Sequence, residues 1–571
     1  MTALSFGATV LDPGHTRFRL WAPALREVGL EIDGRPAIAM MARGDGWFEI
    51  EAACGPGARY LYRLPDGLAV PDPASRAQAD DVHGPSLVVD PDRYPWRNAG
   101  WRGRPWRECV LYELHAGLFG GFDGVKAALP QLAELGVTAV ELMPVGDFSG
   151  TRNWGYDGVL PYAPDRAYGS PDQLKALVDA AHGLNLMMFL DVVYNHFGPD
   201  GNYLARYAPH FFRDDLDTPW GPAIDFRRPQ VRRYFTENAL YWLQEYRFDG
   251  LRLDAVHAIS DAAWLDEMAA EVRSAIGPGR HVHLVLEHDG NEASHLRGDF
   301  AAQWNDDAHH ALHVLLTGER EGYYRDYIDA TRQLARCLVE GFAYQGDPSL
   351  HRDGRPRGTP SADLPPTKFV VFLQNHDQVG NRPFGERLAS LADREALQAA
   401  VALQLLAPGI PLIFMGEETF DERPFLFFTD FHGALATAVR EGRRREFRHF
   451  ASFASEKIGD PNALESFEGC RLAPTGDAGF YRTLLALRRR VVVPRLDGTR
   501  AIDGAVIGPG AVSARWRLGD GSTLAIAANL AAEGCPFTSP GATPFYESRP
   551  GALTRHTLQG RSTVAFLVAP P

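Results

Sequence analysis

Acidic side chains lie at or near the ends of four apolar segments of this sequence. Asp191 lies in LMMFLDVVYNH, Asp254 in GLRLDAVH and Glu287 in VHLVLEHD. Asp377 ends the fourth segment, KFVVFLQNHD. An unpaired buried carboxylate is costly, so four such placements are not typical of an ordinary core. Two carboxyl groups that flank a glycosidic bond can act as nucleophile and as acid and base, so the pattern predicts glycoside hydrolysis.

Asp254 and Glu287 are the candidates for these two roles, on consecutive expected strands. Arg252 precedes Asp254 by two residues, so it shares a strand face with Asp254 and is expected to keep it ionised. Glu287 follows an apolar run, where burial is expected to raise its pKa and retain a proton for acid catalysis. We expect the two carboxyl groups to lie roughly 5 to 5.5 Å apart, the separation found in retaining enzymes.

Other side chains near the same strand ends are expected to bind sugar. Histidine and carboxylate groups offer hydrogen bonds to hydroxyls, and aromatic faces match the C–H faces of pyranose rings. The predicted substrate-binding residues are Tyr156, Asp191, His196, Arg252, His257, Asp306 and His376. Packing alone is the alternative for the aromatic residues Tyr156, Trp154 and Trp304. Mutual pairing of the polar groups is the alternative for the others.

These segments belong to an alternation of strands and helices that begins at Val110. Eight strands are expected in VLYELHA, VTAVELMP, the four acidic segments, AAQWNDD and PLIFMGEE. The helices between them are exemplified by SPDQLKALVDAAHGLN, with Ser170 as cap, Pro171 in the first turn and Gly183 at the end. Parallel strands joined by helices predict a (β/α)₈ TIM barrel, in which the strand ends converge on one pocket.

Short alternating strands are expected on both sides of the barrel. They include TRFRLWAP and GWFEIE near the start, and SARWRLG, STLAIAANL and STVAFLVA near the end. We therefore predict an N-terminal immunoglobulin-like β-sandwich over residues 1–95 and a catalytic barrel over 96–490. A C-terminal β-sandwich domain is predicted over 491–571.

Composition limits the partners. The chain has 571 residues, with 58 Lys and Arg against 72 Asp and Glu, and this net charge of -14 argues against nucleic acid and acidic membranes. The run Arg443, Arg444 and Arg445 is expected to form a solvated helix face rather than a phosphate site. Five cysteines, odd in number and never in a CxxC pair, indicate neither a disulfide framework nor a zinc site.

Location and cofactors are predicted from missing patterns. The start, MTALSFGATVLDPGH, lacks the basic and apolar parts of a secretory signal. The stretch AVALQLLAPGIPLIFM is broken by Pro408, Gly409 and Pro411, which favours a barrel over a membrane span. A cytoplasmic protein is expected, with no prediction of oligomeric state. HHALH lacks an HExxH pattern, and EF-hand and phosphate-loop patterns are absent, so no metal or organic cofactor is expected.

Four segments resemble, in order, the signature regions of the α-amylase family of retaining glycoside hydrolases. They are DVVYNH (191–196), GLRLDAVH (250–257), LVLEHD (284–289) and FLQNHD (372–377). The resemblance implies that Asp254 is the nucleophile, Glu287 the acid and base, and Asp377 the stabiliser of the transition state. It also implies supporting roles for Arg252, His196 and His376.

Further segments, among them ELMPVGDFSGTRNWGYDGV, YNHFGPDGNYL and AQWNDDAHHALHVLLTGE, resemble a trehalose-releasing branch of that family. This implies hydrolysis of the α-1,4 bond next to the terminal trehalose of maltooligosyl trehalose. A glycogen debranching or branching enzyme of the same family is one alternative, because it shares the four regions. A non-catalytic carbohydrate-binding barrel is another, because a fold does not guarantee activity. The intact Asp254, Glu287 and Asp377 argue against it.

Overall fold

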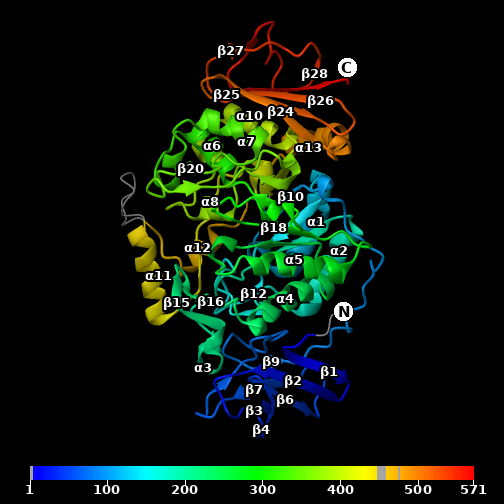
Figure 1. Cartoon of the computed structure of the whole chain (residues 1–571), viewed down its shortest axis with the longest axis vertical. Coiled ribbons are helices and arrows are strands. Elements are labelled where there is room, and N and C mark those ends of the chain that lie inside the picture. The colour runs from blue at the N-terminus through cyan, green and yellow to red at the C-terminus, as the bar shows by residue number, and fades with distance from the viewer. Residues whose placement is uncertain (1–3, 447–457, 473–475, 571) are drawn as a thin grey trace.

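A closed parallel barrel of eight strands lies at the centre of the molecule, between antiparallel sheets at its two ends (Figure 1). The computed structural model describes residues 4–446, 458–472 and 476–570. Residues 1–3, at the start of the segment considered for a secretory signal, lie outside the described residues. The predicted fold class is confirmed.

The barrel closes in the strand order β10-β11-β14-β17-β18-β19-β22-β23. The bounds, in that order, are Leu111–Leu114, Ala139–Leu142, Met187–Val192, Gly250–Leu253, His283–Leu286, Ala302–Trp304, Phe369–Val371 and Ile410–Phe414. All eight predicted strands are present in chain order. Gly250 opens β17 because a Cβ there would lie 2.1 Å from the ring of Phe189 on the neighbouring β14.

Helices cover the outside of the barrel. The longer ones are α1 (Gly121–Leu135), α2 (Pro171–Gly183), α4 (Pro229–Gln244), α5 (Ala263–Ile276), α6 (Asp306–Thr317), α7 (Ala330–Glu340), α10 (Arg394–Leu406), α11 (Gly433–Glu446) and α13 (Gly479–Leu487). Helix α2 begins as predicted, because Ser170 and Gln173 form a capping box and Pro171 is its first residue. Helix α2 also ends at Gly183, as predicted.

One connection departs from the predicted alternation of strands and helices. Between β18 and β19 the chain forms a single 3₁₀ turn, His295–Arg297, and no α-helix. Gly290 and Gly298 interrupt this segment, and glycine is unfavourable inside a helix. The connection therefore remains a loop that contributes side chains near the barrel mouth.

Antiparallel sheets lie at opposite ends of the molecule, on either side of the barrel domain (Figure 1). The N-terminal sheets contain, in chain order, β1 (Gly7–Asp12), β2 (His15–Trp21), β3 (Gly29–Ile32), β4 (Ile38–Ala39), β5 (Met41–Gly44), β6 (Trp47–Ala52), β7 (Arg59–Arg63), β8 (Ala69–Val70) and β9 (Ser86–Leu87). The main C-terminal sheet contains β24 (Arg500–Gly508), β25 (Ala511–Arg517), β26 (Thr523–Asn529), β28 (Pro544–Glu547) and β30 (Ser562–Val568). The domain boundaries at residues 95 and 490 stay predictions.

Hydrogen bonds join the end sheets to barrel helices. The Ser5 amide donates to Glu237 on α4 at 2.7 Å. The Trp516 indole donates to the Leu338 carbonyl on α7 at 3.0 Å. No helix within the described ranges is long and apolar enough to cross a membrane.

Candidate active site

The carboxyl ends of the barrel strands surround a pocket of about 370 Å³. The side chains of residues far apart in the sequence meet there, as is usual for this fold. The described residues that line it are Trp154, Tyr156, His196, Trp220, Arg252, Asp254, Ala255, His257, Glu287, Asp289, His376, Asp377, Asn381 and Phe427. The three predicted catalytic carboxyls and most of the predicted binding residues are therefore brought together. Asp191 and Asp306 are not among the lining residues.

One buried guanidinium connects three carboxyl groups. Arg252 Nη1 donates to Asp191 Oδ2 and to Asp254 Oδ1, each at 2.7 Å. Its Nη2 lies 2.9 Å from Glu287 Oε2. The Trp304 ring lies beneath, with its centroid 4.2 Å from the guanidinium carbon. Such charge-assisted contacts are strong and directional, so Arg252 orients Asp254 and Glu287 relative to each other.

Asp254 has further partners that favour its ionised form. Asn195 Nδ2 donates to Asp254 Oδ2 at 2.8 Å and to its main-chain carbonyl at 2.9 Å. Burial acts to raise the pKa of Asp254, but the charge of Arg252 and the Asn195 hydrogen bond hold it below its ordinary value. The next residue, Ala255, has a φ of 39°, so the chain turns sharply directly after this carboxylate.

Glu287 shows the opposite tendency. Burial raises the pKa of Glu287 well above its ordinary value, in the direction expected from its apolar strand. Arg252 opposes this shift, whereas the charges of Asp254 and Asp377 increase it. The Ala255 amide donates to Glu287 Oε2 at 2.7 Å. Two neighbouring carboxyls whose pKa values are moved apart are suited to different roles at one pH.

Asp377 and His376 begin the short helix α8 (His376–Gly380), which follows β22. Burial raises the pKa of Asp377, and Asn381 Nδ2 donates to Asp377 Oδ1 at 2.5 Å. The His376 amide donates to Glu113 Oε2 at 3.0 Å, and its Nδ1 donates to Glu113 Oε1. Burial acts to lower the pKa of His376, but the Glu113 charge and hydrogen bond raise it above its ordinary value.

Asp191 is not among the lining residues of the pocket, and its contact with substrate stays a prediction. It is only 2% exposed, and its Oδ2 accepts from both Arg252 Nη1 and the Tyr156 hydroxyl, the latter at 2.5 Å. Burial raises the pKa of Asp191 to about 6, against the opposing charge of Arg252. Because Asp191 is an interior residue of β14, its side chain is covered by the residues it supports.

An exposed tryptophan that was not singled out from the sequence stands at the pocket. Trp220 joins β15 (Phe212–Thr218) to β16 (Gly221–Ile224) and is 46% exposed. Its ring stacks on His196, with centroids 5.2 Å apart and planes at 16°. His196 Nε2 donates to the Tyr156 carbonyl at 2.9 Å. The aromatic residue within the turn sequence TPWGP was the available signal, because an exposed ring beside carboxylates is suited to sugar stacking.

Asn381, Phe427 and Glu113 were also not identified from the sequence. Asn381 follows Asp377 by four residues, a spacing that brings side chains together on a helix. Glu113 interrupts the apolar strand β10, and a buried acid in a strand is a recognisable signal. Phe427 gave no signal, since it lies in a segment with no regular structure.

Asp306, the first residue of α6, accepts a hydrogen bond from Gln378 at 3.4 Å. Burial raises the pKa of Asp306 to about 7, and the charges of Asp289 and Asp377 add to this effect. Asp306 is therefore close enough to the pocket to respond to its charges. Its contact with substrate stays a prediction.

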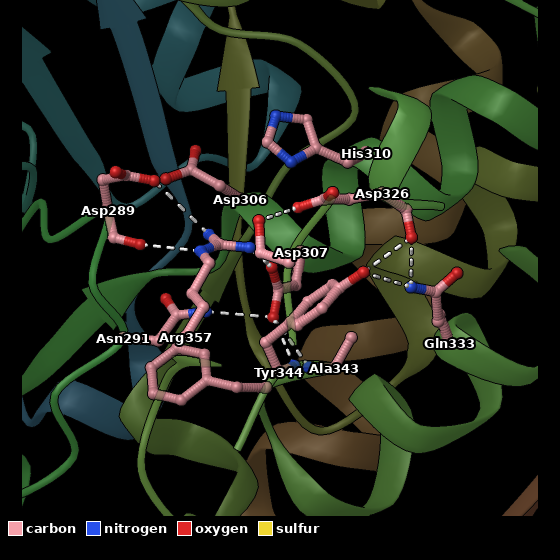
Figure 2. A network of polar contacts seen from close by, with 12 residues as sticks. Asp289, Asn291, Asp306, Asp307, His310, Asp326, Gln333, Ala343, Tyr344 and Arg357 are labelled. Atoms are coloured by element: carbon pink, nitrogen blue, oxygen red, sulfur yellow. Dashed lines mark hydrogen bonds and ion pairs between the residues drawn. The ribbon is translucent and has the colours of Figure 1, made fainter. Parts of the chain in front are cut away.

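A buried ion pair lies next to Asp306 (Figure 2). Arg357 Nη1 donates to Asp307 Oδ1 at 2.5 Å, and its Nε donates to the Asp289 carbonyl at 2.8 Å. Asp307 is fully buried and its Oδ2 accepts from Asn291 Nδ2 at 3.0 Å and from the Ala343 amide at 2.8 Å. The network ties the loop after α7 to the loop after β18, and so holds Asp289 in the pocket wall.

The histidines of HHALH lie on α6 and pack against neighbouring segments, which agrees with the predicted structural role. His309 Nδ1 donates to the Leu373 carbonyl at 2.7 Å. The His313 ring stacks on Tyr324 with a centroid separation of 4.3 Å. Burial lowers the pKa of His309 to about 3. Across the ranges that the structure describes, no group of three or more His, Cys, Asp or Glu side chains is arranged to hold a metal ion.

Known proteins resemble this chain over nearly its whole length. The model of the alpha amylase catalytic domain matches residues 91–209, and that of a domain of unknown function matches residues 499–565. A malto-oligosyltrehalose trehalohydrolase of Deinococcus radiodurans is 42% identical over 566 residues, covering 94% of this chain and 92% of the relative. The chain belongs to the malto-oligosyltrehalose trehalohydrolase family.

Two other comparisons also match most or all of the chain. A malto-oligosyltrehalose trehalohydrolase of Saccharolobus solfataricus is 40% identical, covering 85% of this chain and 87% of the relative. A crystal structure from Salmonella typhimurium, provisionally described as an alpha amylase, has a TM-score of 0.94 and 45% identity, with full coverage of both chains. The family resemblance therefore extends to the outer sheets as well as the barrel.

Proposed function

We propose that the protein hydrolyses the α-1,4-glucosidic bond next to the terminal trehalose of maltooligosyl trehalose and releases free trehalose. Its full-length relatives bear the name of this activity. The reaction belongs to trehalose biosynthesis, and we propose that it takes place in the cytoplasm. The shared contact of Arg252 with Asp254 and Glu287 supports the hydrolytic chemistry, and the similarity to the named relatives over most of the chain supports the release of trehalose.

The proposed reaction has two steps with net retention. In the first, Asp254 attacks the anomeric carbon, the bond to the leaving oxygen breaks, and Glu287 donates its proton to that oxygen to release trehalose. In the second, Glu287 takes a proton from water, the water oxygen attacks the anomeric carbon, and the ester bond to Asp254 breaks. The lowered pKa of Asp254 and the raised pKa of Glu287 support this division of roles.

Asp377 is proposed to stabilise the positively charged transition state, and residues around it are proposed to bind sugar hydroxyls. A carboxylate that is already held in place stabilises developing positive charge strongly, because it does not have to reorganise as that charge forms. His376, held by Glu113, is positioned to donate a hydrogen bond from its second ring nitrogen. Trp220 offers an exposed aromatic face at the same pocket.

Product analysis tests this function. The protein is incubated separately with maltotriosyl trehalose and with maltopentaose, and released sugars are followed over time. We expect a higher kcat/KM for maltotriosyl trehalose, with trehalose as product. A preference of up to roughly 10⁴-fold is attainable when buried polar groups recognise specific hydroxyls. A ratio at or below one would reject the trehalose-releasing function. Branched or transferred products would favour the alternative of a branching enzyme. Cleavage confined to the α-1,6 bonds of a branched glucan, assayed in parallel, would favour a debranching enzyme.

Substitution of the two carboxyls tests the mechanism. Asp254→Asn is expected to lower kcat by about 10⁴-fold or more, because loss of a nucleophile removes the covalent step. Glu287→Gln is expected to slow the first step less on a substrate whose leaving group needs no proton than on maltotriosyl trehalose, because the missing acid is not needed there. A melting temperature equal to that of the wild-type protein in both variants is the control for folding. Normal turnover by Asp254→Asn would eliminate it as the nucleophile, and no turnover by the wild-type protein would favour a non-catalytic barrel.

A further inference from the structure

Helix α11 lies at the outside of the molecule, beside the barrel (Figure 1). None of its residues is fully buried, and it ends in the basic run Arg443, Arg444 and Arg445. The solvated face predicted for this run is wrong for Arg443, whose side chain is only 11% exposed. The reason is that its guanidinium reaches main-chain and side-chain oxygens at the end of α8.

Arg443 makes contacts with the pocket wall from behind. Its Nη2 donates to the Gly380 carbonyl at 2.6 Å, and its Nη1 donates to Asn381 Oδ1 at 2.9 Å. The guanidinium carbon lies 5.1 Å from the centroid of the Phe427 ring. Asn381 and Phe427 both line the pocket that contains the three predicted catalytic carboxyls.

The chemistry of these groups fixes the orientation of Asn381. A guanidinium only donates hydrogen bonds and a carboxylate only accepts them. The Asn381 amide must therefore present its oxygen to Arg443 and its NH₂ group to Asp377, where Nδ2 lies 2.5 Å from Oδ1. Both contacts favour the same orientation, so Arg443 holds from one side the amide that donates to Asp377 on the other.

The backbone at this position has little room to move. A Cβ on Gly380 would lie 2.0 Å from the Trp154 ring, so the end of α8 is closely packed against the pocket wall. Arg443 holds the carbonyl of this same glycine. The guanidinium thus links the main chain of α8 and the Asn381 side chain in one rigid unit.

We propose that Arg443 is a positioning residue for Asp377: it fixes the amide of Asn381, which in turn orients the Asp377 carboxylate in the pocket. The proposal rests on the proposed function, because it assumes that Asp377 acts on the sugar in its ionised form. Arg443, on the outer helix α11, thus affects the orientation of a carboxyl group at the barrel mouth.

Charge also connects Arg443 to Asp377. Burial raises the pKa of Asp377, and the positive charge of Arg443 opposes that shift. Arg443 itself also pairs with Glu446 on the same helix, with Nη1 3.0 Å from Oε2. The other titratable or charged groups that influence Asp377 from the surrounding elements, or are influenced by it, are His376, Arg252, Asp254, Glu287, Asp306 and Tyr323. Loss of Arg443 removes one cation near Asp377, and it leaves the Asn381 NH₂ group, which donates to Asp377, less firmly held. Both changes favour protonation of Asp377, so its pKa would rise further.

A purely structural role, in which Arg443 only fastens α11 to the barrel, makes different predictions. Such a role would change the melting temperature without changing the pH dependence of the reaction. The test therefore compares the single variants Arg443→Met, Arg443→Lys and Asn381→Ala. It also includes the double variant Arg443→Met/Asn381→Ala and the control Arg445→Met. Arg445 is an exposed neighbour on the same helix and serves as the matched control.

For Arg443→Met we expect kcat to fall about 10-fold, since a hydrogen bond to a charged group is lost, with KM changed less than about 2-fold. The acidic limb of the kcat profile should move to higher pH. Arg443→Lys, which keeps the charge but not the planar fork, should restore the pH profile in part. At a pH above the acidic limb, where Asp377 is ionised in every variant, Arg443→Met/Asn381→Ala should be no slower than Asn381→Ala, because both substitutions interrupt the same hydrogen-bonded path. Arg445→Met should behave as wild type.

Equal kcat values and pH profiles for Arg443→Met and Arg445→Met would overturn the proposal. So would additive losses in the double variant, or a lowered melting temperature with an unchanged rate. If the wild-type protein cleaves α-1,4-glucans without releasing trehalose, the proposed function fails, but the effect of Arg443 is still measured on that cleavage. A wild-type protein with no turnover on either substrate would reject both.

Discussion

The Nη2 atom of Arg252 lies 2.9 Å from Oε2 of Glu287, so the candidate acid is held by a positive charge that opposes its protonation. Burial outweighs this charge, and the pKa of Glu287 remains well above its ordinary value. The same guanidinium binds the predicted nucleophile at 2.7 Å. Its geometry thus fixes the spacing of the two carboxyls, and the short separation of retaining enzymes stays a prediction supported by this shared partner.

Arg252→Lys should lower kcat by about 100-fold, because small misplacement of catalytic groups is costly and an ammonium cannot bind both carboxyls in the fork geometry. The measurement is steady-state kinetics on maltotriosyl trehalose, with melting temperature as the control for folding. Arg247→Lys, at a cation outside the pocket, is the matched substitution. Near-normal kcat in a folded Arg252→Lys protein would contradict the role of the fork.

Trp220→Ala should raise KM by about 10-fold with a smaller effect on kcat, because an exposed stacking surface contributes mainly to binding. Trp220→Phe should recover part of the affinity. Leu216→Ala is the control, since Leu216 lies on the same hairpin, is 41% exposed and does not line the pocket. An unchanged KM in Trp220→Ala would remove this ring from the binding surface.

The Asp307–Arg357 pair should respond strongly to loss of one partner. Arg357→Met leaves a buried carboxylate without its cation, and the expected cost is about 3–5 kcal/mol. Asp307→Asn combined with Arg357→Met should be less destabilised than the sum of the single variants, because the uncompensated charge is gone. Thermal unfolding of the four proteins measures this coupling. Additive losses would show that the two groups do not act as a pair.

The buried carboxyl of Glu417 should make the free energy of unfolding depend on pH. It is 5% exposed, and burial raises its pKa to about 8. A carboxyl with a raised folded-state pKa contributes stability that is fully present below its unfolded pKa and is lost as pH rises through its folded pKa. The contribution of Glu417 should therefore fall between about pH 4.5 and pH 8, with a slope of up to about 1.4 kcal/mol per pH unit.

Glu417→Gln should remove that dependence, because the amide stays neutral and still accepts from the Phe414 amide, which lies 2.6 Å from Oε2. The melting temperature of the variant relative to wild type should rise from pH 5 to pH 8. Glu134→Gln is the control, since that side chain is 71% exposed. A constant difference between wild type and Glu417→Gln across this range would contradict the prediction.

The barrel and the predicted catalytic carboxyls were accessible from sequence because both depend on local patterns. Buried parallel strands form continuous apolar runs, and acids at or near their ends are easily recognised. The signals at Asp254, Glu287 and Asp377 were of this kind. The missing helix between β18 and β19 was not foreseen, since the strand pattern says little about the segments between strands.

What the sequence by itself determined was which strands form the barrel and which acids meet at its mouth, because strand order and residue type decide both. Only the tertiary structure decided which side chains line the pocket and which support it from behind. Asp191 has the same strand-end signal as Asp254, but Arg252 and Tyr156 cover it. Arg443 has the same sequence signal as Arg445, yet only Arg443 reaches the pocket wall. Burial and partner choice depend on contacts between distant segments, and neither residue type nor spacing encodes those contacts locally.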